Sequence, residues 1–176
     1  MVNARETAAS VLDPELPALT IEDLGILRDV RERDGAVTVT ITPTYSGCPA
    51  LAQIASDLRR RLTEAGYERV DIRTELSPPW TTDWITPDGR RKLADAGIAP
   101  PGERGGPVAV TLGSPSSAVW PTQPPIAGSV GHTAAAPCPR CGSRDTRELS
   151  RFSGTACKAL YQCLLCLEPF EHVKEH

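Results

Sequence analysis

The sequence lacks a strong excess of either charge, a long apolar segment and, over most of its length, cysteine. Its 19 Lys and Arg residues against 22 Asp and Glu residues leave a formal net charge of -3, which argues against a general binder of nucleic acid. No run of about 18 apolar residues occurs, so we expect no transmembrane helix and no membrane partner. The first ten residues carry both charges and no apolar stretch, unlike an ordinary signal peptide. Together these absences predict a cytoplasmic protein.

What is present is the composition of a folded protein. Apolar residues make up 40% and charged residues 23% of the 176 residues, which is close to ordinary globular composition. The length allows one domain and a smaller module. We expect an α+β domain over residues 1–101, a flexible Pro/Gly/Ser-rich linker over 102–136 and a cysteine-rich module over 137–176.

The first of these segments carries the pattern of a small mixed sheet. The expected elements are a helix at 7–12, strands at 26–33 and 36–42, a helix opened by Pro49, a strand at 68–76 and a helix from Pro87 to Asp95. Asp34-Gly35 between the first two strands is a strong hairpin signal. One apolar stripe runs along the long helix at three- and four-residue steps: Leu51, Ile54, Leu58 and Leu62. The order αββαβα predicts a sheet with helices on one face.

Two CxxC pairs dominate the last segment, Cys138 with Cys141 and Cys163 with Cys166. Two residues between thiols let both sulfur atoms of a turn reach one ion, and the second pair completes the tetrahedron that Zn²⁺ prefers. We therefore predict a small β zinc-ribbon module whose folding energy comes from structural zinc. Four thiolates also suit an iron–sulfur cluster or one redox-active iron. Disulfides are a third alternative, although clustered thiols in a reducing cytosol are more often metal ligands.

The other candidate ligands in this part of the chain are weaker. Cys157 fits a small buried apolar residue. His132, His172 and His176 are expected to be exposed, because four cysteines already satisfy zinc. Acidic and basic residues nearly balance here, and four thiolates with one Zn²⁺ add negative charge, so we do not expect a nucleic-acid-binding ribbon.

Cys48 stands alone far upstream of the other cysteines. It lies immediately before Pro49, so we expect it at the N-cap of the long helix, where the helix dipole and free N–H groups lower the pKa of a thiol. Thr44 flanks the same loop, and Asp13 and Glu15 offer carboxylates if the first loop packs against it. A reactive or metal-contacting thiol and a capping cysteine without chemistry both fit these residues.

Six strings of residues carry a further signal: 13–17 (DPELP), 23–25 (DLG), 42–50 (TPTYSGCPA), 80–87 (WTTDWITP), 155–161 (TACKALY) and 168–170 (EPF). The first three resemble the domain shared by SufT-like and cytosolic iron–sulfur assembly proteins. With the other three, the chain resembles the PaaD family, phenylacetate-degradation proteins of the 1,2-phenylacetyl-CoA epoxidase system.

The resemblance implies a role in a multicomponent monooxygenase that epoxidises the ring of phenylacetyl-CoA, with its oxygenase and reductase subunits as partners. The chain has no Glu-x-x-His pair, which a di-iron oxygenase subunit needs, and no GxGxxG nucleotide motif. We therefore expect an accessory protein, without turnover of its own, that matures or delivers the iron or iron–sulfur centre of other subunits. In that hypothesis Cys48, with Asp13, Glu15 and Thr44, transiently holds iron or a cluster. The alternative is a stoichiometric structural or regulatory subunit with no metal-delivery role.

Overall fold

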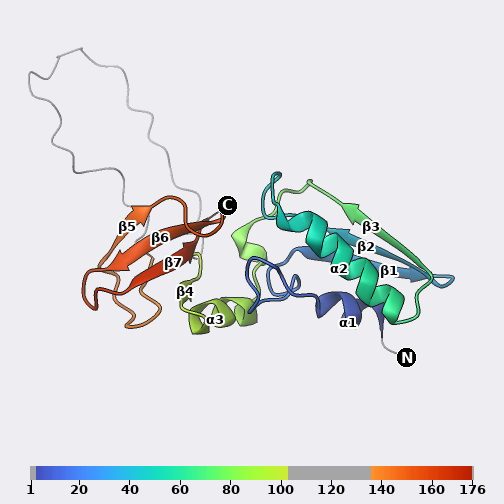
Figure 1. Cartoon of the computed structure of the whole chain (residues 1–176), viewed down its shortest axis with the longest axis horizontal. Coiled ribbons are helices and arrows are strands. Elements are labelled where there is room, and N and C mark those ends of the chain that lie inside the picture. The colour runs from blue at the N-terminus through green and yellow to red at the C-terminus, as the bar shows by residue number, and fades with distance from the viewer. Residues whose placement is uncertain (1–2, 103–135, 176) are drawn as a thin grey trace, which may run out of the picture.

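The computed structural model describes residues 3–102 and 136–175, which form two β-sheets and three α-helices (Figure 1). The elements are α1 (Ala4–Ala9), β1 (Leu27–Arg33), β2 (Ala36–Ile41), α2 (Ala50–Glu64), β3 (Arg69–Thr74), the 3-10 helix η1 (Thr82–Trp84), α3 (Pro87–Asp95), β4 (Ile98–Ala99), β5 (Thr146–Ser150), β6 (Lys158–Cys163) and β7 (Pro169–Val173). The predicted α+β class is confirmed. Nearly all of the expected linker falls on residues 103–135, which lie outside the described residues. His132 and His176 also lie outside them. Among the described helices, none is long and apolar enough to cross a membrane.

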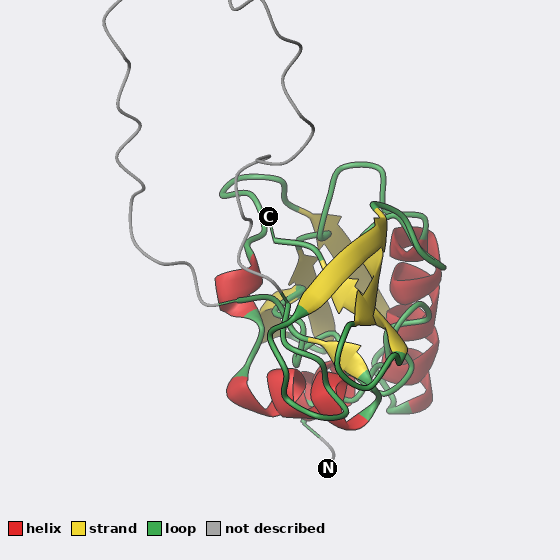
Figure 2. Ribbon diagram, turned by 90° about the vertical axis from the view of Figure 1, so that its left-hand side faces the viewer, coloured by secondary structure: helices red, strands yellow, loops and turns green. Residues whose placement is uncertain are grey.

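The first sheet has the strand order β1-β2-β3, with β1 antiparallel and β3 parallel to the central β2. Asp34 and Gly35 connect β1 to β2 with φ angles of 50° and 70°, the left-handed conformations that a tight hairpin turn requires. Val37, Val39 and Ile41 alternate with threonines along β2 and are buried. Figures 1 and 2 show α2 lying across one face of this sheet, with α1 beside it.

The predicted apolar stripe attaches α2 to the sheet. Ile54, Leu58 and Leu62 are fully buried in the same core as β2, and burying each such side chain contributes about 2 kcal/mol. The start of the helix differs from the prediction. Pro49 occupies the N-cap position and Cys48 is the residue before it, because the first helical residue is one further along the chain.

The other two helices are set by their caps. α1 begins before the predicted residue 7, because the Asn3 side chain accepts a hydrogen bond from the Arg5 backbone N–H and caps the helix there. α3 has the predicted bounds, with the Thr86 hydroxyl accepting from the Gly89 N–H at its start and Gly97 at φ 76° just after its end. The chain then enters β4, which α3 contacts.

The second sheet joins β4, near the end of the described residues 3–102, to the three strands of residues 136–175. Its order is β4-β7-β6-β5, and β4 pairs with β7 in parallel, with Ala99 opposite His172. The side chain of Val173 at the end of β7 packs into the core of the first sheet. His172 is only 8% exposed, so the expectation that it is exposed is wrong. The pairing of β4 with β7 covers it, and its Nδ1 lies 3.2 Å from the carbonyl oxygen of Ala99.

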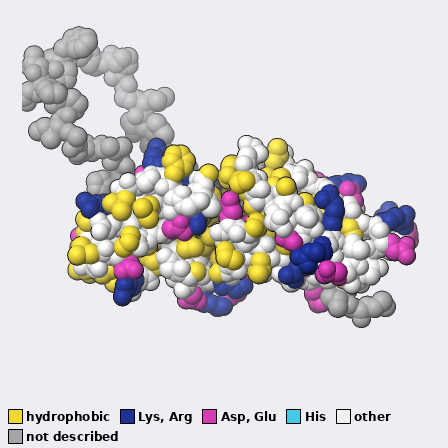
Figure 3. Space-filling model, in the orientation of Figure 1, with side chains coloured by type: hydrophobic (Ala, Val, Ile, Leu, Met, Phe, Trp, Pro, Cys, Tyr) yellow, Lys and Arg dark blue, Asp and Glu magenta, His cyan; other side chains and the backbone are white. Residues whose placement is uncertain are grey.

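Charged side chains of both signs are interspersed over the face of the molecule shown in Figure 3. Most of the basic side chains that form ion pairs do so with an acidic residue close to them in sequence. Examples are Arg31 with Asp29 and Arg73 with Asp71. This distribution agrees with the near balance of charge in the sequence.

Candidate metal-binding sites

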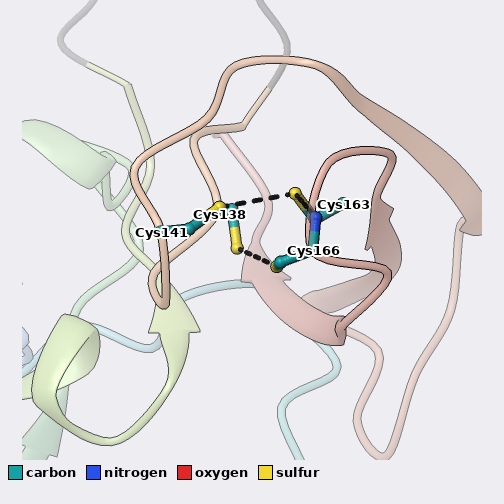
Figure 4. A group of neighbouring side chains, drawn as sticks. All are labelled: Cys138, Cys141, Cys163 and Cys166. Atoms are coloured by element: carbon teal, nitrogen blue, oxygen red, sulfur yellow. Dashed lines mark hydrogen bonds between the residues drawn. The ribbon is translucent and has the colours of Figure 1, made fainter.

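The four cysteines of the two CxxC pairs face one another (Figure 4). Their sulfur atoms all lie within 4.8 Å of one another, with 3.7 Å between Cys138 and Cys166 and 3.6 Å between Cys141 and Cys163. Four thiolates at about 2.3 Å from a tetrahedral Zn²⁺ are about 3.8 Å apart. All four are free thiols rather than disulfides. The donor set therefore fits one tetrahedral metal ion, and two of the sulfur separations are already close to the ideal value.

Two similar turns present these thiols. The residue after each pair has a left-handed backbone, with φ 74° at Gly142 and φ 63° at Leu167. The backbone N–H of Cys166, followed by that of Leu165 and the neighbouring thiols of Cys166 and Cys141, lowers the pKa of the Cys163 thiol to about 6, which favours the thiolate that a metal needs. A closed set of four protein ligands is typical of structural sites. A bound ion would link the loop before β5 to the turn between β6 and β7.

A second cluster forms around Cys48, in the loop between β2 and α2. Asp13 is only 5% exposed, and its Oδ1 accepts hydrogen bonds of 2.8 Å from the backbone N–H groups of Glu15 and Leu16. The charges of the Glu15 and Asp13 carboxylates act on the Cys48 thiol, and the Thr44 hydroxyl is hydrogen-bonded to the Cys48 sulfur. The structure thus brings together the four residues of the predicted N-terminal site.

The acidity of Cys48 differs from the prediction. Burial raises the pKa of its thiol, and the charges of Glu15 and Asp13 raise it further, which outweighs the hydrogen bond from the Ala50 N–H. Cys48 is therefore not the acidic N-cap cysteine that its position indicates, because its thiol is partly buried, two carboxylates act on it and Pro49 holds the cap.

The part of the chain over residues 136–175, here called the ribbon, adds a second thiol to this cluster. The Cys157 sulfur lies 3.9 Å from Oε2 of Glu15 and 3.0 Å from the Thr155 hydroxyl. Next to it Lys158, 6% exposed, donates to Oε2 of Glu171 at 2.6 Å. Burial, chiefly, raises the pKa of Cys157. Two thiols from distant parts of the chain therefore share one carboxylate neighbour.

Sequence reasoning misses this contribution from the ribbon. It predicts that Cys157 is a small buried apolar residue, and Cys157 is buried, but its neighbours are ionisable. One signal is available within residues 155–161. Lys158 opens a strand of otherwise apolar pattern, and a lysine at such a position is buried only when it is paired.

The charges of both thiols act on Tyr45. Burial raises the pKa of its phenol, followed by the charges of Cys48, Glu15 and Cys157. The same side chain lines an open cavity of about 470 Å³ together with Trp80. The cluster therefore lies beside a hollow in the surface.

Comparisons with known proteins give this geometry a family. Residues 122–174 match the PaaD zinc beta ribbon domain, and residues 5–72 match the family described as iron-sulfur cluster assembly protein. Over 169 residues the chain is 39% identical to an Escherichia coli (strain K12) protein named as a subunit of 1,2-phenylacetyl-CoA epoxidase, covering 94% of this chain and 87% of that protein. The chain belongs to the PaaD family. The resemblance predicted from the six strings is thereby confirmed.

Other similarities of this PaaD-family chain are shorter. It is 36% identical over 78 residues to the Fe-S protein maturation auxiliary factor SufT of Staphylococcus aureus (strain USA300), covering 43% of this chain and 88% of that protein. The chain also matches the crystal structure of a domain of unknown function, DUF59, from Bacillus anthracis. The match covers 51% of this chain and 87% of that one, with 27% sequence identity and a TM-score of 0.48.

Proposed function

We propose that this PaaD-family chain is an accessory protein of the phenylacetyl-CoA ring-epoxidase system of aerobic phenylacetate catabolism. In this proposal it matures or delivers the iron or iron–sulfur centre of the oxygenase or reductase subunits. The name of the E. coli relative supports the assignment to this epoxidase system. The iron–sulfur assembly family match and the SufT relative support the maturation role.

The observation that carries the proposal is the gathering of Cys48, Asp13, Glu15 and Thr44 at one place in the part of the chain that matches the assembly family. Thiolate and carboxylate are both ligands for iron. A carrier must also release its cargo. Because burial and two carboxylates raise the pKa of Cys48, binding iron must displace a firmly held proton, and this cost keeps the complex reversible.

The four-cysteine site has a different role in this proposal. We assign Zn²⁺ to it, because the sulfur separations match a closed tetrahedral thiolate site. The ribbon buries few large side chains of its own, so metal binding supplies much of its folding free energy. The ion is structural and takes no part in handling cargo.

The test is Cys48→Ser in cells that express the complete epoxidase system. We expect the variant to fold and keep its zinc, while the iron content of the purified oxygenase and reductase subunits falls several-fold. Ser46→Ala, at an exposed position of the same loop, is the matched control and should leave client iron unchanged.

A reconstitution separates this proposal from a stoichiometric subunit. Oxygenase and reductase that were matured in cells with the wild-type chain should be active after the chain is removed. If their activity requires its continuous presence, and if Cys48→Ser leaves the clients fully loaded with iron, the maturation role is wrong.

A further inference from the structure

We propose that Cys157 of the ribbon and Cys48 of the N-terminal part are two thiol ligands of one cargo site for Fe²⁺, with the carboxylate of Glu15 between them. This inference deepens the proposed function and rests on it. It assigns a metal-binding role to Cys157, and it makes the cargo site a joint product of the two parts of the chain.

The distance between Cys157 and Glu15 is the first support. In a tetrahedral site, a thiolate at about 2.3 Å and a carboxylate oxygen at about 2.1 Å from the same ion are about 3.6 Å apart. The Cys157 sulfur and Oε2 of Glu15 are 3.9 Å apart. The two atoms therefore need to move by only a few tenths of an ångström to share one ion.

The distribution of charge is the second support. The charge of Lys158 acts on both Asp13 and Glu15, but its ammonium is committed to Glu171, which also accepts from the Ser153 hydroxyl at 2.5 Å. Among the described residues, no Lys, Arg or His nitrogen lies within 4.0 Å of a carboxylate oxygen of Asp13 or Glu15. The cluster thus carries negative charge without a full counter-ion, in a partly buried place where an added cation is favourable.

Asp13 positions the carboxylate of the site rather than binding the ion. Its Oδ1 accepts the backbone N–H groups of both Glu15 and Leu16 at 2.8 Å and so fixes the turn from which Glu15 projects. With two thiols and a carboxylate, the donor set is of mixed hardness and suits a borderline divalent ion. The proposed function makes that ion Fe²⁺.

The site is more open than the zinc site. Within the described part of the chain, the four ribbon cysteines are the one group of three or more His, Cys, Asp or Glu residues whose ligand atoms all lie within 4.8 Å of one another. The Cys48 and Cys157 cluster therefore closes only when an ion draws its donors together. Cys48 belongs to the N-terminal part of the chain and Cys157 to the ribbon, so a bound ion adds a further link between the two parts. A change in how the two parts contact each other would then change the affinity for the ion, which suits a site that must release it again.

The test uses the zinc-loaded full chain under anaerobic conditions, titrated with Co²⁺ as a spectroscopic probe. We expect the wild type to bind one Co²⁺ in addition to its zinc, with thiolate-to-metal absorption, while metal analysis shows that the zinc stays in place. Cys157→Ser and Cys48→Ser should each lower the thiolate absorption by about half and weaken Co²⁺ binding at least about tenfold. Ala156→Ser, at the exposed neighbouring position, is the control and should behave as wild type.

Folding of the variants is checked by zinc content and circular dichroism, and Cys157→Ala serves as a second substitution at the buried position. If both Cys157 variants are folded and bind Co²⁺ as the wild type does, the inference is overturned.

Client iron content in cells then separates the inference from the function on which it rests. Loss of client iron with Cys48→Ser but not with Cys157→Ser overturns the inference and leaves the maturation role intact. Loss with both supports the two-thiol site. If neither variant changes client iron, the maturation role itself is wrong, whatever the Co²⁺ titration shows.

Discussion

The carboxylate of Glu15 lies 3.9 Å from the sulfur of Cys157, although the two residues come from opposite ends of the chain. The charge of Glu15 also acts on the thiol of Cys48 in the loop before α2. In both thiols burial is the largest cause of the raised pKa, and Glu15 raises the pKa further. One side chain therefore influences the reactivity of two cysteines.

Removing this charge should make both thiols more reactive. We expect Glu15→Gln to lower the pKa of Cys48 and of Cys157 and to speed their alkylation by iodoacetamide at pH 8 about threefold, because the thiolate is the reacting form. Mass spectrometry of the zinc-loaded chain resolves each cysteine. Glu68→Gln, which removes an exposed carboxylate elsewhere, should change neither rate, and unchanged rates in Glu15→Gln would show that its charge does not reach the thiols.

The turn of residues 23–25 should be intolerant of substitution at Gly25. A Cβ atom on Gly25 would lie 2.5 Å from the carbonyl oxygen of Trp84, and its φ is 68°. In the same turn, the carbonyl oxygen of Leu24 accepts a hydrogen bond of 2.8 Å from the indole N–H of Trp80. The clash therefore falls in a region that is already packed. We expect Gly25→Ala to lower the free energy of unfolding in urea by about 3 kcal/mol.

Gly35 provides the comparison for that loss. Its φ of 70° is nearly the same, but nothing lies within 4 Å of the position of its Cβ. Gly35→Ala should therefore cost about 1 kcal/mol, from the left-handed backbone alone. Equal losses at the two positions would mean that the contact between Gly25 and Trp84 contributes nothing to stability.

Local signals explain which elements could be predicted from the sequence. Asp34-Gly35 defines the first hairpin through conformations that these two residues adopt readily. Pro87 and Gly97 mark the ends of α3 because proline suits the start of a helix and glycine suits the position after its end. The spacing of the four ribbon cysteines likewise reflects the geometry of turns, and the structure brings their sulfur atoms together.

The contacts between the two parts of the chain have no such signal. β4 is two residues long and pairs with β7 across the segment 103–135, so neither strand shows its partner in its own sequence. The position of Cys48 indicates a helix N-terminus, but the pKa of its thiol depends first on burial and then on the charges of Glu15 and Asp13, all of which tertiary packing sets. The proximity of Cys157 to Glu15 depends on the same packing and is visible only in the folded chain.

The buried His172 should make stability depend on pH near neutrality. Burial lowers the pKa of its imidazole, so the unfolded chain takes up a proton near its ordinary value of about 6.5 while the folded chain stays neutral. We expect stability to be full above that pH and to fall as the pH drops towards the lower folded pKa. Urea unfolding at pH 7.5 and pH 5.5 measures this loss.

The matched variant is His172→Gln, which cannot take up the proton. Its loss of stability over the same interval should be smaller than that of the wild type. Protonation of the ribbon thiolates weakens metal binding in both proteins, so the difference between them isolates the histidine. Identical pH dependence would show that His172 is equally easy to protonate in the folded and unfolded chains.

The two turns that present the ribbon cysteines offer an opposed pair of substitutions. Both Gly142 and Leu167 have left-handed backbones, which cost a side-chain-bearing residue about 1 kcal/mol or more. The Leu167 side chain is 66% exposed and buries little in return. Leu167→Gly should therefore tighten zinc binding about fivefold, because metal binding and folding of the ribbon are coupled. Gly142→Ala, with no atom within 4 Å of its Cβ position, should weaken it by a similar factor. Competition with a chromophoric chelator measures both. Weaker zinc binding by Leu167→Gly would mean that this leucine stabilises its turn through its side chain despite its exposure.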